Sequence, residues 1–385
     1  MKIIADANIP LLADAFGPLG EVVALPAERI SAEAVRDADA LLVRSVTKVD
    51  ERLLAGSRIR FVATATIGFD HIDRACLKSR GIEFAYAPGS NARSVAEYVL
   101  AALTVLAAHA KHRMTDKVLG IVGCGNVGAR LARLASAIGI KVLMNDPPLA
   151  RQTRDPKYVP IDDLAEADVV TFHVPLERGG PDPTYHMING ALLERLKRGV
   201  TIINSSRGSV AETVALKAAH DSGRIGALVL DVWEGEPNID LDLLAMTDLA
   251  TPHIAGYSYD GKVNGTRMVL EALCRCLGVE RQWDPSALLP PAAQPRVRIP
   301  TGATLHETLR PAIRAAYDIE ADDRRLRAIA DHPPERRGKY FGALRKDYPV
   351  RREFPETTAE IDRPGPGAAE ALKALGFRVE VSGHS

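Results

Sequence analysis

The chain has 385 residues, which exceeds the roughly 250–300 at which a single hydrophobic core stops growing, so two or three domains are expected. Lysine plus arginine equals aspartate plus glutamate, at 49 each, and this balance argues against a general role in binding nucleic acid or an anionic membrane. No apolar run approaches the about 18 residues of a membrane span, and the four cysteines form no CxxC pair. We therefore predict a cytoplasmic protein with reduced thiols and with neither a membrane nor a nucleic acid as partner.

Residues 1–90 alternate short apolar runs with polar or helical segments, which predicts β–α units and a parallel sheet covered on both faces. Ligands of such sheets bind beyond the carboxyl ends of the strands, where this segment carries hydroxyls, glycines and cations. These residues suit an anionic ligand, although they equally suit ordinary turns. The candidate strands are Lys2–Ala5, Glu21–Leu25, Ala40–Val43, Phe61–Thr64 and Ile82–Tyr86.

Residues 94–109 form a long and mostly apolar segment without glycine or proline. A helix that is apolar on all sides is buried, so we expect this one to connect two domains. His109 and His112 stand at its end with a spacing that could hold a metal, but no third ligand cluster accompanies them. We predict no metal site.

Residues 117–146 have the order strand, glycine-rich turn, helix, strand and acid. Gly123, Gly125 and Gly128 form a GxGxxG turn, in which the glycines let the backbone approach a pyrophosphate at the positive end of the helix. Asp146 follows Gly128 by 18 residues and is placed to accept hydrogen bonds from a ribose. Because an acid there repels a 2′-phosphate, NAD is favoured over NADP. The alternative is a tight turn that binds no ligand.

Further β–α units continue to residue 251, with strands expected at 169–174, 201–204, 227–230 and 249–250, so that residues 117–251 complete a doubly wound domain. A helix at 261–277 is expected to return to the first domain. Residues 283–300 contain five prolines and are interpreted as a linker. The rest contains a helix at 304–317 and a final helix-and-strand piece at 368–381, and is predicted to be a small domain used for association.

Three residues that follow separate strands have the side chains needed for hydride transfer from an alcohol. His253 could take the hydroxyl proton, and Glu236 could fix its tautomer. Arg207 could bind a 2-hydroxy carboxylate and polarise the developing carbonyl. Taken singly, each residue has a plainer interpretation. Glu236 could be an acid in a turn, His253 a capping or core histidine, and Arg207 the start of a helix.

The segments GCGNVG, NSSRGS, DVWEGEP and TPHIAGY, in this order, resemble the D-isomer-specific 2-hydroxyacid dehydrogenases. The resemblance implies an α/β fold with a Rossmann-type doubly wound NAD domain, a flavodoxin-like substrate domain and a small C-terminal α+β dimerisation domain. The corresponding boundaries are residues 1–95 completed by 255–285 for the substrate-binding lid, 96–254 for the NAD domain and 286–385 for the dimerisation domain. The implied assembly is a homodimer.

Position by position, the resemblance implies catalytic roles for Arg207, Glu236 and His253, and substrate contacts at Ser45, Thr66 and Tyr257. Together with the glycine-rich turn, it implies NAD contacts at Gly123, Gly125, Asn126, Val127, Gly128, Asp146, Val174, Ser205, Ser206, Arg207, Asp231 and Gly256. Val174 stands where threonine is frequent, so only a backbone contact is expected there. Ala211-Glu212 departs from a more usual Val-Asp after the Arg-Gly turn.

The segments VRSVTKVD, TATIGFDHID and PGSNARSVAEYV are similar to the branch of this family that oxidises 4-phospho-D-erythronate in vitamin B6 biosynthesis, and RREFPE resembles a segment of its C-terminal domain. A small phosphorylated 2-hydroxy acid is therefore the expected substrate. We further hypothesise that Arg44 and Ser45, with Lys48 or Arg93, bind its phosphate. Another phosphorylated acid such as 3-phosphoglycerate, or an NADH-sensing binding module, stays open as an alternative.

Overall fold

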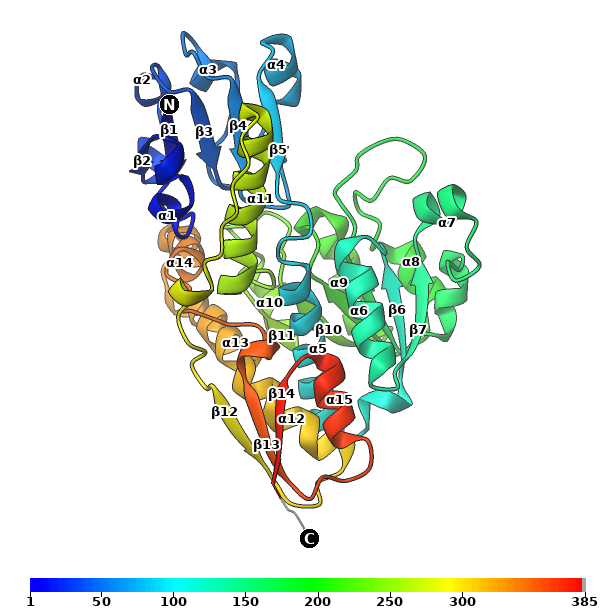
Figure 1. Ribbon diagram of the computed structural model, residues 1–385. Coiled ribbons are helices and arrows are strands. Elements are labelled where there is room, and N and C mark those ends of the chain that lie inside the picture. The colour runs from blue at the N-terminus through cyan, green and yellow to red at the C-terminus, as the bar shows by residue number, and fades with distance from the viewer. Residues whose placement is uncertain (383–385) are drawn as a thin grey trace. The chain divides into compact units, whose positions relative to one another are not determined.

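The computed structural model describes residues 1–382, which form two compact units (Figure 1). The first contains Met1–Asn91 and Ser258–Pro290, and the second contains Ala92–Tyr257 and the chain from Pro291 onward. The C-terminal segment therefore belongs to the same compact unit as the glycine-rich turn. The three-domain division of the sequence analysis stays a prediction.

The first unit is a five-stranded parallel sheet in the order β2-β1-β3-β4-β5, which is the flavodoxin-like order. All five strands expected from residues 1–90 are present. The strands are β1 (Lys2–Asp6), β2 (Glu21–Leu25), β3 (Ala40–Val43), β4 (Phe61–Thr64) and β5 (Glu83–Tyr86). The helices are α1 (Leu12–Phe16), α2 (Ala32–Val35), α3 (Glu51–Leu54), α4 (Arg74–Ser79) and α11 (Tyr259–Leu277), with short 3₁₀ turns at Gly17–Leu19, Ala27–Arg29 and Ser286–Leu288.

Side chains of this sheet alternate between two hydrophobic clusters, as the period of a strand requires. Ile3 and Leu42 pack on one face with residues of α1 and α11. Ile4 and Leu41 pack on the other face with residues of α2, α3 and α4. The helix expected at 261–277 thus returns to the first unit as α11, where Figure 1 shows it beside β4 and β5.

The second unit contains a six-stranded parallel sheet in the order β11-β10-β9-β8-β6-β7. Its strands are β6 (Val118–Val122), β7 (Lys141–Asn145), β8 (Val169–Phe172), β9 (Val200–Asn204), β10 (Ile225–Leu230) and β11 (Leu249–Ala250). Its helices are α5 (Ala92–His109), α6 (Asn126–Ala137), α7 (Pro147–Thr153), α8 (Gly190–Arg195), α9 (Thr213–Asp221) and α10 (Leu241–Met246), with 3₁₀ turns at Met114–Asp116, Ile161–Glu166 and Gly208–Val210. The strand order reverses between β6 and β8, which places a ligand crevice at the carboxyl ends of these strands.

The C-terminal segment adds a three-stranded parallel sheet in the order β12-β13-β14. Its elements are β12 (Arg296–Ile299), α12 (Leu305–Ala316), α13 (Ile319–Arg327), α14 (Pro334–Lys346), β13 (Thr358–Asp362), α15 (Ala368–Leu375) and β14 (Arg378–Ser382), with 3₁₀ turns at Ala328–Asp331 and Phe354–Glu356. The linker interpretation of residues 283–300 was wrong for Arg296–Ile299. Pro295 and Pro300 flank this strand rather than interrupt it, and β12 is an edge strand, where proline is tolerated.

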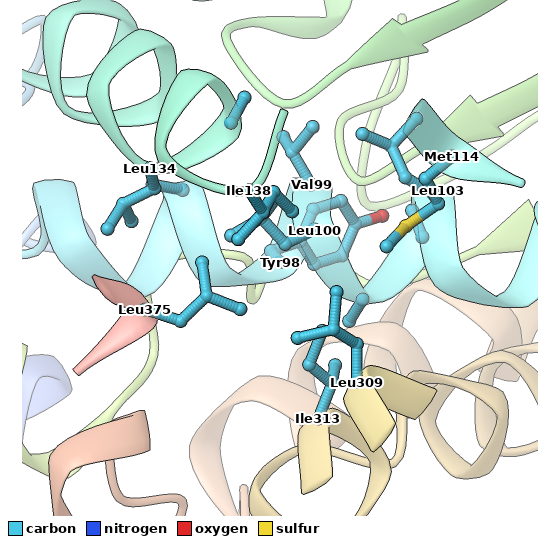
Figure 2. Packing of buried hydrophobic residues seen from close by; sticks show 14 of the residues in the cluster. Tyr98, Val99, Leu100, Leu103, Met114, Leu134, Ile138, Leu309, Ile313 and Leu375 are labelled. Carbon is cyan, nitrogen blue, oxygen red and sulfur yellow. The ribbon is translucent and has the colours of Figure 1, made fainter. Parts of the chain in front are cut away.

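Helix α5 is the centre of the largest hydrophobic cluster, which joins the six-stranded sheet to the C-terminal segment. Figure 2 shows Leu100 of α5 near Ile138 after α6, with Leu309 of α12 and Leu375 of α15 on the other side. Fully burying such a side chain contributes about 1.5–3 kcal/mol. The expectation of a buried helix here is confirmed, and the C-terminal segment shares a core with the rest of its unit.

Candidate active site

The glycine-rich turn between β6 and α6 has the geometry that a bound pyrophosphate requires. Gly123 has φ 87°, a left-handed conformation that favours glycine. A Cβ atom on Gly128 would lie 2.1 Å from the Gly123 carbonyl oxygen, so the third glycine is needed for close packing. A Cβ atom on Gly125 would meet nothing within 4 Å, and no side chain caps the first turn of α6. The backbone N–H groups at this helix end are therefore available to an anion.

Asp146, at the end of β7, is held in place by two backbone groups. Its Oδ2 accepts a hydrogen bond from the Cys124 N–H at 2.8 Å, and its Oδ1 caps α7 through the Leu149 N–H at 2.9 Å. Each carboxylate oxygen can accept more than one hydrogen bond. The carboxylate is thus oriented beside the glycine-rich turn and can still accept from ribose hydroxyls.

The three predicted catalytic residues follow three strands that are neighbours in the sheet. Strands β9, β10 and β11 run parallel and adjacent, and their carboxyl ends lie at the same edge. Arg207 follows β9, Glu236 follows β10 and His253 follows β11. The sheet therefore brings to one edge residues that are separated by up to 46 positions in the chain.

Asp231 organises the loop that carries His253. Its buried carboxylate accepts hydrogen bonds from the Thr251 hydroxyl at 2.7 Å, the Ile254 N–H at 2.7 Å and the Ala255 N–H at 3.0 Å. Its carbonyl oxygen accepts from the His253 N–H at 2.6 Å. Burial raises the pKa of Asp231, against the opposing effects of His253 and of these hydrogen bonds. His253 has φ 59°, a conformation that costs a non-glycine residue about 1–3 kcal/mol and persists because the loop is fixed on both sides.

Glu236 and His253 form a carboxylate–imidazole pair, with 2.5 Å between Glu236 Oε1 and His253 Nδ1. Burial alone would raise the pKa of Glu236, but the charge and hydrogen bond of His253, and the charge of Arg345, outweigh burial and lower it. Because an ionised carboxylate can only accept, Nδ1 carries the proton. Nε2 makes no hydrogen bond within residues 1–382 and can accept a proton.

Asn204 and His173 order the loop that carries Ser205, Ser206 and Arg207. The Asn204 side chain accepts from the Ser206 N–H and hydroxyl at 3.1 and 2.7 Å, and donates to the Arg207 carbonyl at 3.0 Å. The ring of His173, at the end of β8, lies 3.3 Å from the Ser205 hydroxyl. Burial lowers the pKa of His173 to about 3, so this ring stays neutral and is a support rather than a base. This role of His173 was not predicted from the sequence.

The other predicted NAD contacts lie around the same edge of the sheet. Val174 packs near Gly123, where a Cβ atom would be 2.9 Å from its Cγ1. Asn126 begins α6 and is exposed, whereas the Val127 side chain packs on the core, so only its backbone can meet a ligand. Gly256 follows the His253 loop and is half-buried.

The substrate residues predicted in the first unit also follow neighbouring strands, β3 and β4. Arg44 is half-buried and Ser45 is exposed, directly after β3. The Thr66 hydroxyl lies 2.6 Å from the Thr64 hydroxyl and donates to the Gly68 carbonyl at 2.9 Å. Lys48 pairs with Asp50 at 3.1 Å on the surface.

Arg93, named as an alternative phosphate ligand, is instead engaged within the second unit. It pairs with Glu97 at 2.8 Å and donates to the Leu375 carbonyl at 2.7 Å. These contacts tie α5 to the end of α15 and leave Arg93 with a structural role.

Arg351, from the C-terminal segment, holds the His253 loop, a role that was not predicted from the sequence. It is buried, and its Nη2 donates to the Ala255 carbonyl at 2.6 Å, the Ile254 carbonyl at 3.4 Å and the Ser94 hydroxyl. Its guanidinium lies 4.1 Å from the centre of the Tyr317 ring. The RREFPE motif contains this residue, but nothing in the sequence indicates that it contacts a loop almost 100 positions earlier.

Replacing Arg351 with methionine should lower the free energy of unfolding by about 2–4 kcal/mol, because it removes the charge-assisted hydrogen bonds from the buried guanidinium to the Ala255 and Ile254 carbonyls. Urea unfolding followed by circular dichroism measures this, with the exposed Arg336→Met on α14 as the matched control. A loss no larger than that of the control would show that Arg351 does not hold the loop.

Neither a membrane-spanning helix nor a metal-binding cluster is found among the described residues, 1–382. No helix in this range is both long and apolar enough to cross a membrane. No group of three or more histidine, cysteine or acidic side chains in the same range is arranged to hold a metal ion.

Comparisons with known proteins agree with this fold. Residues 95–255 match the family of D-isomer specific 2-hydroxyacid dehydrogenase NAD-binding domains, and residues 288–376 match a domain of unknown function, DUF3410. An erythronate-4-phosphate dehydrogenase of Salinibacter ruber is 49% identical over 366 residues, which cover 93% of each chain. The chain belongs to the erythronate-4-phosphate dehydrogenase family. Its relative from Marinobacter nauticus is 44% identical over 99% of this chain and 100% of that one.

Solved structures agree with the fold of this family. The D-lactate dehydrogenase of Aquifex aeolicus, complexed with NAD and lactic acid, is 26% identical with a TM-score of 0.59, and the match covers 72% of this chain and 96% of that one. The 3-phosphoglycerate dehydrogenase of Entamoeba histolytica is 24% identical with a TM-score of 0.60 over 72% and 95%. The expectation of a D-isomer-specific 2-hydroxyacid dehydrogenase with an NAD domain is confirmed.

Proposed function

We propose that this protein oxidises 4-phospho-D-erythronate at C2 to 2-oxo-3-hydroxy-4-phosphobutanoate, in the vitamin B6 pathway. The observation that carries the proposal is the Glu236–His253 pair, which lies at the same carboxyl edge of the six-stranded sheet as the glycine-rich turn. The identity of 49% to a relative that carries this enzyme name supports the choice of substrate.

NAD supplies the hydride acceptor at this site. Gly123, Gly125 and the first turn of α6 would hold its pyrophosphate, and Asp146 its ribose hydroxyls. Contacts at Val174, Ser205, Ser206, Asp231 and Gly256 belong to the same proposal.

His253 would act as the general base through Nε2, which takes the proton of the C2 hydroxyl as hydride leaves C2. Glu236 would stabilise the imidazolium that forms and keep Nδ1 protonated throughout. Arg207 would bind the substrate carboxylate and polarise the carbonyl that develops at C2. The proton and the hydride together account for the two hydrogens that the alcohol loses.

Kinetics on a panel of 2-hydroxy acids tests the substrate. NADH formation should give the highest kcat/KM with 4-phospho-D-erythronate, ahead of 3-phosphoglycerate and of D-erythronate. A preference for 3-phosphoglycerate, or tight NADH binding without turnover of any of these acids, would contradict the proposal.

The predicted substrate contacts at Ser45, Thr66, Tyr257 and Arg44 are part of the same proposal. Arg44→Ala should raise KM for 4-phospho-D-erythronate by an amount equivalent to about 1.5–3 kcal/mol, because it removes a charge-assisted hydrogen bond to the phosphate. The exposed Arg52→Ala on α3 is the matched control. An unchanged KM in Arg44→Ala would remove Arg44 from the site.

Assembly as a homodimer through the C-terminal segment, and a cytoplasmic location, also belong to the proposal. The mass in solution by light scattering should be twice that of the 41.5 kDa chain.

A further inference from the structure

Helix α14 of the C-terminal segment brings a guanidinium next to the catalytic pair. Nη2 of Arg345 donates a hydrogen bond to the Tyr257 hydroxyl at 3.1 Å, and its guanidinium carbon lies 5.7 Å from the centre of the Tyr257 ring. Tyr348 packs edge-on against the same ring at 5.9 Å. Tyr257 stands four residues after His253, so Arg345 lies beside the loop that carries the proposed base.

The charge of Arg345 is not neutralised by an ion pair within residues 1–382. Its Nε is buried and has no hydrogen-bond partner in the same range. The positive charge of Arg345 acts electrostatically on Glu236, but Glu236 is hydrogen-bonded to His253 and not to Arg345. A buried N–H group without an acceptor is costly, and a bound anion would supply an acceptor for this Nε.

The position of Arg345 in the chain indicates which part of the substrate it meets. All 2-hydroxy acids share the carboxylate and the C2 hydroxyl, and Arg207 and His253, which would bind them, lie within the family-wide segment 95–255. Arg345 lies outside it, in 288–376. A residue outside the shared segment is suited to a part of the substrate that differs among the 2-hydroxy acids.

We propose that Arg345 binds the phosphate group of the substrate through its Nε and Nη groups. The C-terminal segment would then contribute to the preference of the site for a phosphorylated substrate. The planar guanidinium can donate two parallel hydrogen bonds to phosphate oxygens. This inference rests on the proposed function for the identity of the substrate, but not for the class of anion.

Arg345→Gln tests the inference when kcat/KM is measured with 4-phospho-D-erythronate and with D-erythronate. We expect a fall of roughly 10- to 100-fold with the phosphorylated acid, mainly in KM, and little change with D-erythronate. Arg345→Lys should recover part of the loss, because it keeps the charge but not the planar donor pair. Lys346→Gln, at an exposed neighbour on the same helix, is the control.

Equal losses on both acids would overturn the inference and give Arg345 a role in positioning Tyr257 and Glu236 instead. A second measurement separates this inference from the proposed function. With whichever 2-hydroxy acid the wild-type protein oxidises, inorganic phosphate should inhibit competitively, and Arg345→Gln should weaken that inhibition roughly 10-fold or more. Equal inhibition of wild type and variant would contradict the inference even if the physiological substrate is a different acid.

Discussion

His253→Gln should lower kcat for 4-phospho-D-erythronate about 1,000-fold, because glutamine keeps the size of the side chain but cannot take the hydroxyl proton. The affinity for NADH should change by less than about threefold, since the glycine-rich turn and Asp146 are untouched. Steady-state kinetics and NADH fluorescence titration measure the two quantities.

The chain offers a matched control for this variant. His186 and Glu234 form a second histidine–glutamate pair, with 2.5 Å between Nε2 and Oε1 and an exposure similar to that of the catalytic pair. His186→Gln should change kcat by less than about threefold. If His186→Gln and His253→Gln lower kcat equally, the loss reflects general destabilisation and His253 is not the base.

Glu236→Gln should lower kcat by about 100-fold or more with little change in the affinity for NADH. The amide can donate to Nδ1, which favours the ring tautomer that carries its proton on Nε2, where the base must be free. The imidazolium that forms during hydride transfer also loses its countercharge. Kinetics at saturating NAD and substrate measure the effect.

Glu234→Gln is the control for this second variant, because Glu234 makes the equivalent contact to His186 and also accepts from the Thr213 N–H at 3.2 Å. It should leave kcat within about threefold of wild type. Full activity of Glu236→Gln would mean that the carboxylate does not hold the base in its productive tautomer.

Local sequence patterns predicted the parts of the site that depend on neighbouring residues. The turn from Gly123 to Gly128 follows from its spacing and from the strand and helix that flank it. The placement of Arg207, Glu236 and His253 at one edge follows from the rule that parallel strands end together. Their exact partners, such as the Asp231 carboxylate that fixes the His253 loop, required the structure.

Contacts between distant parts of the chain could not be predicted in this way. Arg351 bonds to residues almost 100 positions earlier, and Arg345 to Tyr257, 88 positions earlier, and neither contact has a sequence period. Arg93 looked available for a phosphate because Glu97 and the end of α15 become its partners only when α5 packs on the C-terminal segment. The strand Arg296–Ile299 was not predicted, because the prolines on both sides of it indicated a linker.

Transfer of deuterium from C2 of the substrate tests the central claim most directly. With 4-phospho-D-erythronate deuterated at C2, mass spectrometry should find the label in NADH, one deuterium for each 2-oxo acid formed, and the label should be absent from water. Label in the solvent, or NADH formed without a 2-oxo acid product, would contradict hydride transfer from C2 at this site.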